Sequence, residues 1–155
     1  MMDGRRTLAF SSLDEVMPEV DRLLLGHRSV GNWSLGQICN HLAINILGSV
    51  EGFPVAAPWL VRKLIGPIAK RRILATGTVK EGIKLPQAYI PNSGLDDRAE
   101  AEALRATIRI FSGNSGPMAP HPFFGKLSVA EWHHLHCIHS AHHLSFAVPD
   151  GVKVG

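Results

Sequence analysis

Cysteine is scarce in this chain of 155 residues, and long apolar runs are missing. The two cysteines, Cys39 and Cys137, form no C-x-x-C pair, which disfavours a disulfide-stapled secreted domain. No apolar stretch approaches the roughly 20 residues that a membrane-spanning helix needs. Arg5 and Arg6 are followed by acidic residues before any apolar region develops, so no secretion signal is predicted. These absences predict a cytoplasmic protein without a membrane partner, whose thiols are reduced and packed in the interior.

Aromatic residues make up only 6% of the chain, and the formal charge is only +3. The basic excess gathers in residues 62–84, but a nucleic-acid surface would need a denser basic stripe with more base-stacking aromatics. A solvated helix face is therefore favoured, and no nucleic-acid partner is expected. Hydrophobic residues account for 45% of the sequence, which suits one globular domain over residues 1–155 with its own core.

Four stretches carry apolar residues at helical spacing and predict helices over residues 13–25, 34–51, 96–111 and 128–146. Three of these stretches begin with a capping box, in which a serine and an acid or amide three residues later satisfy each other's backbone N–H groups. The pairs are Ser12 with Glu15, Ser34 with Gln37, and Ser128 with Glu131.

A fifth helical segment, around residues 59–75, is expected to kink at Pro67 or to divide there into two short helices, because Pro67 lacks an N–H and clashes with the preceding turn. Two connections rich in glycine and proline, 76–93 and 112–126, separate the helices, and no β-hairpin signal is present. The pattern predicts an all-α fold, a four-helix bundle with long crossover connections.

Six of the nine histidines lie in residues 128–146, on a stretch whose apolar face should be buried. His139 and His143 are one helical turn apart, so both imidazoles could ligate one metal ion, as in the H-E-x-x-H helix. Ser140 replaces the glutamate of that motif, which disfavours a metalloprotease. His41, on the inward stripe of residues 34–51, is the natural third ligand. An incidental histidine cluster at the surface is the alternative that the spacing leaves open.

The same helical spacing suggests what surrounds such a metal. Trp132 and His136 point inward before the ligand pair and are expected to line one wall of a mostly apolar pocket, while His136 and His142 could hydrogen-bond a ligand or the metal ligands. The two long connections are expected to reach over this pocket, with the aromatic residues of 121–124 at its rim. The basic residues of 62–72 could contact the carboxylates of an anionic thiol.

Two sequence blocks resemble a known superfamily. Asn32-Trp33-Ser34-x-x-Gln37-x-x-x-His41-Leu42 and His139-x-x-His142-His143 resemble the helix 2 and last-helix signatures of the DinB-like superfamily. The chain most resembles the DinB-like domains of unknown function, through the blocks NWSLGQICNHLA, GIKLP and HPFFGKLSVAEWHHLHCIHSAHHLSF. The resemblance implies a four-helix bundle with two crossovers and a divalent metal, zinc or nickel, held by His41, His139 and His143. By the same resemblance, His142 is not a ligand.

The resemblance also implies an activity, because its characterised members are mostly transferases or isomerases that use low-molecular-weight thiols. A role in detoxification or stress response and a small-molecule ligand follow as expectations. Those relatives often read H-H-R-G-Q where this chain reads His142-His143-Leu144-Ser145-Phe146, so a charged group near the helix end is missing here. The alternative is a non-catalytic helical bundle that binds a ligand or partner, with a structural metal or none. Apolar residues in the loop 53–60 make a homodimer a further expectation.

Overall fold

The computed structural model describes residues 4–80 and 84–151. Its elements are η1 (Leu13–Glu15), α1 (Val16–Leu23), β1 (His27–Ser29), α2 (Leu35–Glu51), α3 (Trp59–Leu64), α4 (Gly66–Thr76), η2 (Gln87–Tyr89), α5 (Asp97–Gly113), α6 (Val129–Leu144) and β2 (Ala147–Pro149). The chain is therefore mostly helical, as predicted. Gly82 and Ile83 of the GIKLP block lie outside the described residues.

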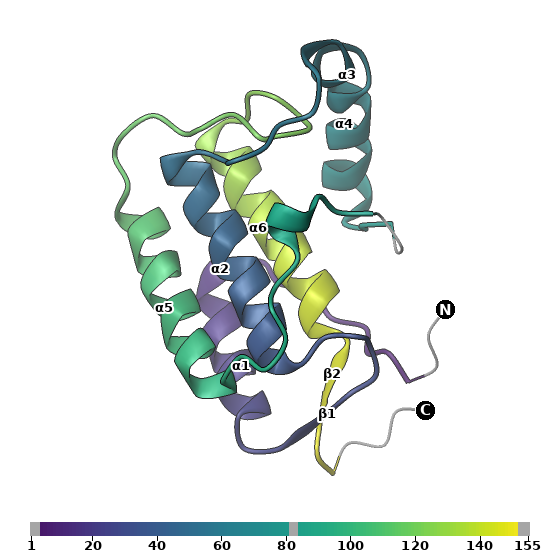
Figure 1. Cartoon of the computed structure of the whole chain (residues 1–155), viewed down its shortest axis with the longest axis vertical. Coiled ribbons are helices and arrows are strands. Elements are labelled where there is room, and N and C mark those ends of the chain that lie inside the picture. The colour runs from purple at the N-terminus through teal and green to yellow at the C-terminus, as the bar shows by residue number, and fades with distance from the viewer. Residues whose placement is uncertain (1–3, 81–83, 152–155) are drawn as a thin grey trace.

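The helices α1, α2, α5 and α6 lie side by side and form the body of the molecule (Figure 1). Apolar side chains from each of them fill the space between the helices, and Trp132 is the largest fully buried one. Both cysteines are buried among these side chains, as the sequence predicted. Within the described residues, no helix has both the length and the apolar character that a membrane crossing requires.

All three predicted capping boxes are present. The Ser34 hydroxyl accepts from the N–H of Gln37, whose side chain accepts from the Ser34 N–H, and Ser128 with Glu131 repeats this exchange at the start of α6. Because each box fixes the first turn of its helix, the histidines further along α2 and α6 are held at defined heights. The fifth helical segment is divided into two short helices, one of the two predicted outcomes, since α3 ends at Leu64 and α4 starts at Gly66 with Pro67 in its first turn.

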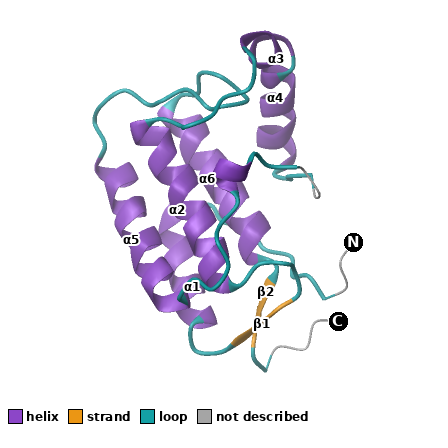
Figure 2. Cartoon of the chain, in the orientation of Figure 1, coloured by secondary structure: helices purple, strands orange, loops and turns teal. Residues whose placement is uncertain are grey.

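A small β-sheet was not predicted, so the strictly sheet-free fold is wrong in this detail. β1 and β2 pair antiparallel, with His27 opposite Pro149 and Ser29 opposite Ala147 (Figure 2). Each strand has three residues, and the two come from opposite ends of the chain, so no local turn signal announces them. The strand β2 also explains why α6 ends at Leu144, two residues earlier than expected.

Gly66 offers a test of how α4 is attached to the body. A Cβ at this position would lie 2.5 Å from the Phe123 carbonyl oxygen, which is backbone and cannot move aside cheaply. We expect Gly66→Ala to lower the free energy of unfolding by about 1–3 kcal/mol, as overpacked sites do. Gly113→Ala is the matched control, because a Cβ there meets open space at the end of α5. Urea denaturation of both variants checks this, and equal stabilities would contradict it.

Candidate metal centre

His41 is held in one orientation by a backbone carbonyl. The residue lies on α2 and is only 2% exposed, and its Nδ1 is 2.9 Å from the Tyr89 carbonyl oxygen. Since that oxygen can only accept, the Nδ1–H of His41 donates, and Nε2 is left with a lone pair. This is the partner by which proteins commonly orient a histidine that ligates a metal. His41 therefore presents Nε2 to the space between α2 and α6.

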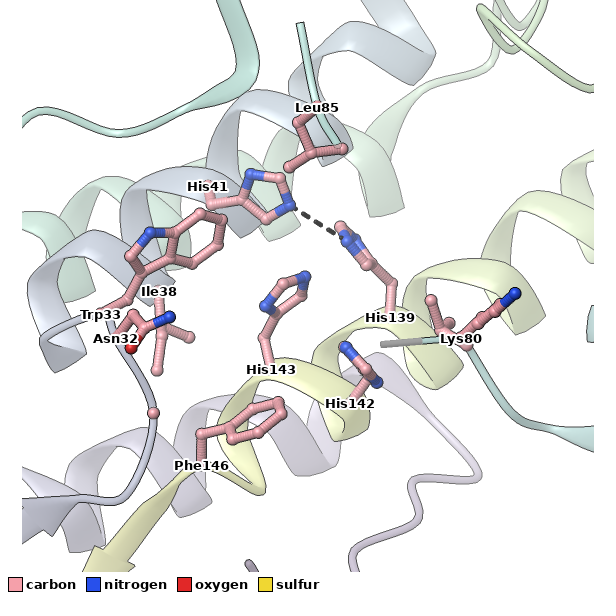
Figure 3. Close-up of a pocket in the computed structure, with 12 residues that line it drawn as sticks. Asn32, Trp33, Ile38, His41, Lys80, Leu85, His139, His142, His143 and Phe146 are labelled. Atoms are coloured by element: carbon pink, nitrogen blue, oxygen red, sulfur yellow. Dashed lines mark hydrogen bonds between the residues drawn. The ribbon is translucent and has the colours of Figure 1, made fainter. Parts of the chain in front are cut away.

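His139 and His143 face His41 from α6, as their spacing predicted (Figure 3). The Nε2 atoms of His41 and His139 are 3.2 Å apart, and the rings of His41 and His143 have centroids 4.6 Å apart. One ring nitrogen from each of the three histidines lies within 4.8 Å of the other two. Three neighbouring histidines that could hold a metal ion are thus brought together by two capped helices.

The spacing of these nitrogens fits a metal ion. With Zn–N bonds of about 2.0–2.1 Å, two ligands of a tetrahedral ion are separated by about 3.3 Å. The 3.2 Å between the Nε2 atoms of His41 and His139 is close to that separation. In the metal-free chain His41 Nε2 carries a lone pair, so it accepts from the Nε2–H of His139. A bound ion would take the place of that proton. Among the described residues this cluster has no carboxylate or thiol, so an ion here would retain its full charge.

Burial keeps the three imidazoles neutral. Desolvation lowers the pKa of His41, and the hydrogen bond to Tyr89 only partly opposes it. The pKa values of His139 and His143 are lowered further, first by desolvation and then by repulsion from the neighbouring histidines. Both rings show some surface because they border a cavity, yet protein surrounds them. Neutral rings keep their lone pairs available, which is the state that metal binding requires.

The three histidines border a cavity of about 310 Å³, a size suited to a small molecule. Trp33 stacks on the His143 ring, with centroids 5.3 Å apart and planes at 15°. From the connection after α4, Val79, Lys80 and Leu85 also border the cavity. Figure 3 shows Leu85 near His41 and Lys80 beyond His139. No described lining residue is acidic, and most of the wall is apolar. The expectation of a mostly apolar pocket is confirmed, and the connection 76–93 reaches it as predicted.

His142 borders the same cavity but is engaged by the N-terminal segment. The Arg5 guanidinium lies 3.1 Å from His142 Nδ1, which must accept because arginine only donates. Arg5 also donates to Ser145 Oγ at 2.7 Å and lies over the Phe146 ring. A charged group is therefore present at the end of α6, although the sequence after His143 lacks one. It comes from a residue more than a hundred positions away in the chain.

Trp132 and His136 lie elsewhere, so the expectation that they line this cavity does not hold. Trp132 donates from Nε1 to the Ala119 carbonyl oxygen at 3.2 Å, and its ring stacks on that of His136. His136 lies 3.0 Å from Ser49 Oγ, which already donates to Ile46 O and therefore accepts from His136. Both are fully buried, because α6 contacts protein on more than one face.

The connection 112–126 belongs to that second cluster and does not reach over the metal centre. His121 stacks on Phe124 with centroids 4.2 Å apart, and its ring lies 5.3 Å from that of Trp132. Neither Phe123 nor Phe124 is among the residues bordering the cavity. The aromatic rim expected from residues 121–124 is therefore wrong, because these side chains pack against Trp132 instead.

Sequence reasoning missed three residues that shape the centre. Tyr89 orients His41 through its backbone, so its side-chain identity carries no signal for that role. Arg5 lies in a lead-in without helical period, and only the folded chain brings it to His142. Trp33 stands in the N-W-S block, and its place one residue before the Ser34 cap could have indicated a side chain at the mouth of the site.

Fold and site together define a mostly helical protein with three clustered histidines that could hold a metal ion. The family described as "Protein of unknown function (DUF1569)" matches residues 2–150, so the chain belongs to that family. No curated protein and no solved structure gives a significant match to the chain. Family membership thus covers nearly the whole chain but names no activity, and any function has to be argued from the chemistry of the site.

Proposed function

We propose that the protein binds a divalent metal ion through His41, His139 and His143 and acts on a small molecule in the adjoining cavity. The observation that carries this is the convergence of three neutral ring nitrogens on a cavity of about 310 Å³, whose described lining residues include no acid. A closed structural zinc normally takes a fourth protein ligand. Within the described cluster only three ligands are available, which supports an ion with a position left for substrate.

The charges around the cavity favour an anionic ligand. Three neutral imidazoles leave a divalent ion uncompensated, and among the described residues that border the cavity Lys80 is the one with a charged side chain. Arg5 adds a second positive charge behind His142. A bound ion would lower the pKa of a thiol and bind the resulting thiolate. Lys80 could then pair with a carboxylate of the thiol compound, while Trp33, Ile38 and Phe146 exclude water.

We infer a thiol-dependent transferase or a related enzyme of detoxification or stress response as the activity. This rests on the resemblance of residues 32–42 and 139–143 to the DinB-like superfamily, in which α1, α2, α5 and α6 would be the four-helix bundle. Zinc and nickel are the metals that we propose, since imidazole ligands suit both. The basic residues 62–72 expected to contact a thiol do not border the cavity, and Lys80 takes their place in the proposal.

One observation favours a second candidate, a helical protein that binds a ligand without turning it over. Among the described residues, His142 is the one histidine that borders the cavity outside the proposed ligand set, and its Nδ1 already accepts from Arg5. General acid–base catalysis needs a side chain within hydrogen-bond reach of the reacting proton. In this candidate the metal and Lys80 capture an anionic ligand, and no bond is made or broken.

Thiol binding provides the test. We expect cysteine to raise the melting temperature of zinc-loaded protein by several degrees, since ligand at tenfold excess over its Kd contributes about 1.4 kcal/mol. Serine is the matched ligand, because it replaces only the sulfur by oxygen, and it should have little effect. Glutathione and bacillithiol extend the series.

His139→Ala is the control protein for the same titration. It retains the cavity but lacks one of the three ring nitrogens, so cysteine should no longer change its melting temperature. A thiol that stabilises wild type and His139→Ala equally is not using the metal, and the transferase proposal would then have no mechanism. Turnover of an electrophile by the zinc-loaded protein would separate the enzyme from the ligand-binding candidate.

A further inference from the structure

The helices α3 and α4 form an arm, residues 59–76, that stands apart from the body of the molecule (Figure 1). α3 has no buried residue, and the only one in α4 is Gly66. Large apolar side chains on the arm are instead open to solvent, with exposed fractions of 64% for Trp59, 60% for Leu64 and 72% for Ile68. Leu60 and Ile65 are also more than half exposed. These five residues are the arm's apolar surface.

The other side of the arm packs against the body of the molecule, so the five apolar residues are exposed because they lie on the side that faces away from it. Ile73 and Leu74 are partly buried against the core, and Gly66 packs on the Phe123 backbone. Lys70 forms an ion pair of 2.8 Å with Glu131 of α6. One side of the arm is thus held by the body, and the apolar surface lies on what remains. Scattered single apolar residues are ordinary on protein surfaces, but five large exposed ones within residues 59–68 indicate an interaction site.

The charge of the arm is of one sign. Residues 52–80 contain six basic residues and no acidic one. Lys63, Arg71 and Arg72 are exposed on the same two helices, and Lys63 lies over the Trp59 ring at 5.7 Å from its centroid. Whatever covers this surface has to accept large apolar side chains and neutralise several cations at once.

Three occupants can be compared on these terms. A second copy of the chain, packed about a two-fold axis, would bring the same cations against each other. A nucleic acid would neutralise the cations but leave Leu64 and Ile68 in water. An anionic phospholipid surface satisfies both requirements, since aliphatic side chains and tryptophan enter the interface while lysine and arginine meet the headgroups.

We propose that the α3–α4 arm docks the protein on anionic phospholipid membranes. The contact is peripheral, so it is compatible with the lack of a membrane-spanning helix among the described residues. It replaces the sequence-based expectation of no membrane partner, which rested on the lack of apolar runs. Burial of the apolar side chains and attraction of the cations to the headgroups both favour this contact. Neither effect requires an occupied metal centre.

The test is binding to vesicles in a flotation assay. Wild-type protein should float with vesicles of phosphatidylcholine containing about one third phosphatidylglycerol, and much less with phosphatidylcholine alone. Raised ionic strength should weaken the binding because it screens the headgroup charge. The double variant Ile68→Ser with Arg72→Glu should bind at least about tenfold more weakly, since each cation near such a surface contributes about fivefold and reversal is worse.

A matched control exists on α5, where Arg109 and Ile110 are both exposed. The double variant Arg109→Glu with Ile110→Ser makes the same two chemical changes at a different surface and should bind as wild type does. Equal losses in both variants would show only a global charge effect and overturn the proposal. Equal flotation with both lipid mixtures, or with neither, would also overturn it. Two further results would overturn the proposal if the arm variant abolishes them. One is a dimer in sedimentation, and the other is binding to a DNA duplex without binding to vesicles.

Discussion

Replacing His139 by alanine is expected to reduce the affinity for zinc or nickel by more than about 100-fold, because even partners outside the ligand set change metal affinity by 10–100-fold. His139 supplies the ring nitrogen 3.2 Å from that of His41, so its loss leaves only two of the three described ligands. Metal content of protein purified without a histidine tag, and competition with a chromophoric chelator, measure the effect. His41→Ala and His143→Ala should behave alike.

His134→Ala is the control for these variants. His134 lies on the same helix but is exposed and outside the cluster, so its removal tests whether any histidine would serve. Metal at a hundredfold excess over its Kd should stabilise wild type and His134→Ala by about 2.7 kcal/mol, and His139→Ala hardly at all. Metal below one equivalent per chain, indifferent to all four substitutions, would reject the site.

The helices and the histidine cluster were predictable because their signals are local. The boxes at Ser34 and Ser128 fix where α2 and α6 begin, and the four-residue spacing of His139 and His143 puts both on one face. His41 could be added because it lies on the inward stripe of its own helix. The structure brings these three histidines together, as the sequence predicted, and whether they bind a metal stays a prediction.

The surroundings of the cluster were not predictable to the same extent. Periodicity identifies the inward face of a helix that is buried on one side only. Since α6 is buried on several sides, residue spacing could not decide whether Trp132 and His136 border a cavity. Arg5 reaches His142, and Tyr89 reaches His41, through contacts between distant parts of the chain. The strands β1 and β2 form in the same way, since neither has a partner nearby in sequence.

Acid is expected to destabilise the protein well above the pH at which its carboxylates protonate. Burial lowers the pKa of His121 to about 3 and that of His136 to about 3, from an ordinary value of 6.5. The contacts explain why neither ring takes up a proton readily. Nδ1 of His121 accepts from the backbone N–H groups of Phe123 and Phe124, both at 3.0 Å, and His136 is enclosed by Trp132 and Phe111.

The direction of the change in stability with pH depends on whether the folded or the unfolded chain binds more protons. Above about pH 6.5 both histidines are neutral in the folded and unfolded chains, so they make no difference to stability. Between about pH 6.5 and 3 the unfolded chain is protonated while the folded chain is not, and the free energy of unfolding falls as the pH falls. At about pH 5 the loss is about 2 kcal/mol for each histidine, or about 4 kcal/mol for the pair. His139 and His143 add to this loss in metal-free protein, since their pKa values are lowered too.

Urea denaturation of metal-free protein between about pH 7.5 and 5 measures this loss, which is a large part of the 5–15 kcal/mol typical of a domain. His136→Gln keeps an N–H donor for Ser49 but cannot titrate, so its stability should fall less steeply with pH than that of wild type, by about 2 kcal/mol over this range. His134→Gln is the matched control, because it makes the same chemical change at an exposed position of the same helix. A pH dependence that is identical in wild type and His136→Gln would contradict the assignment, since the lost stability would then come from other groups.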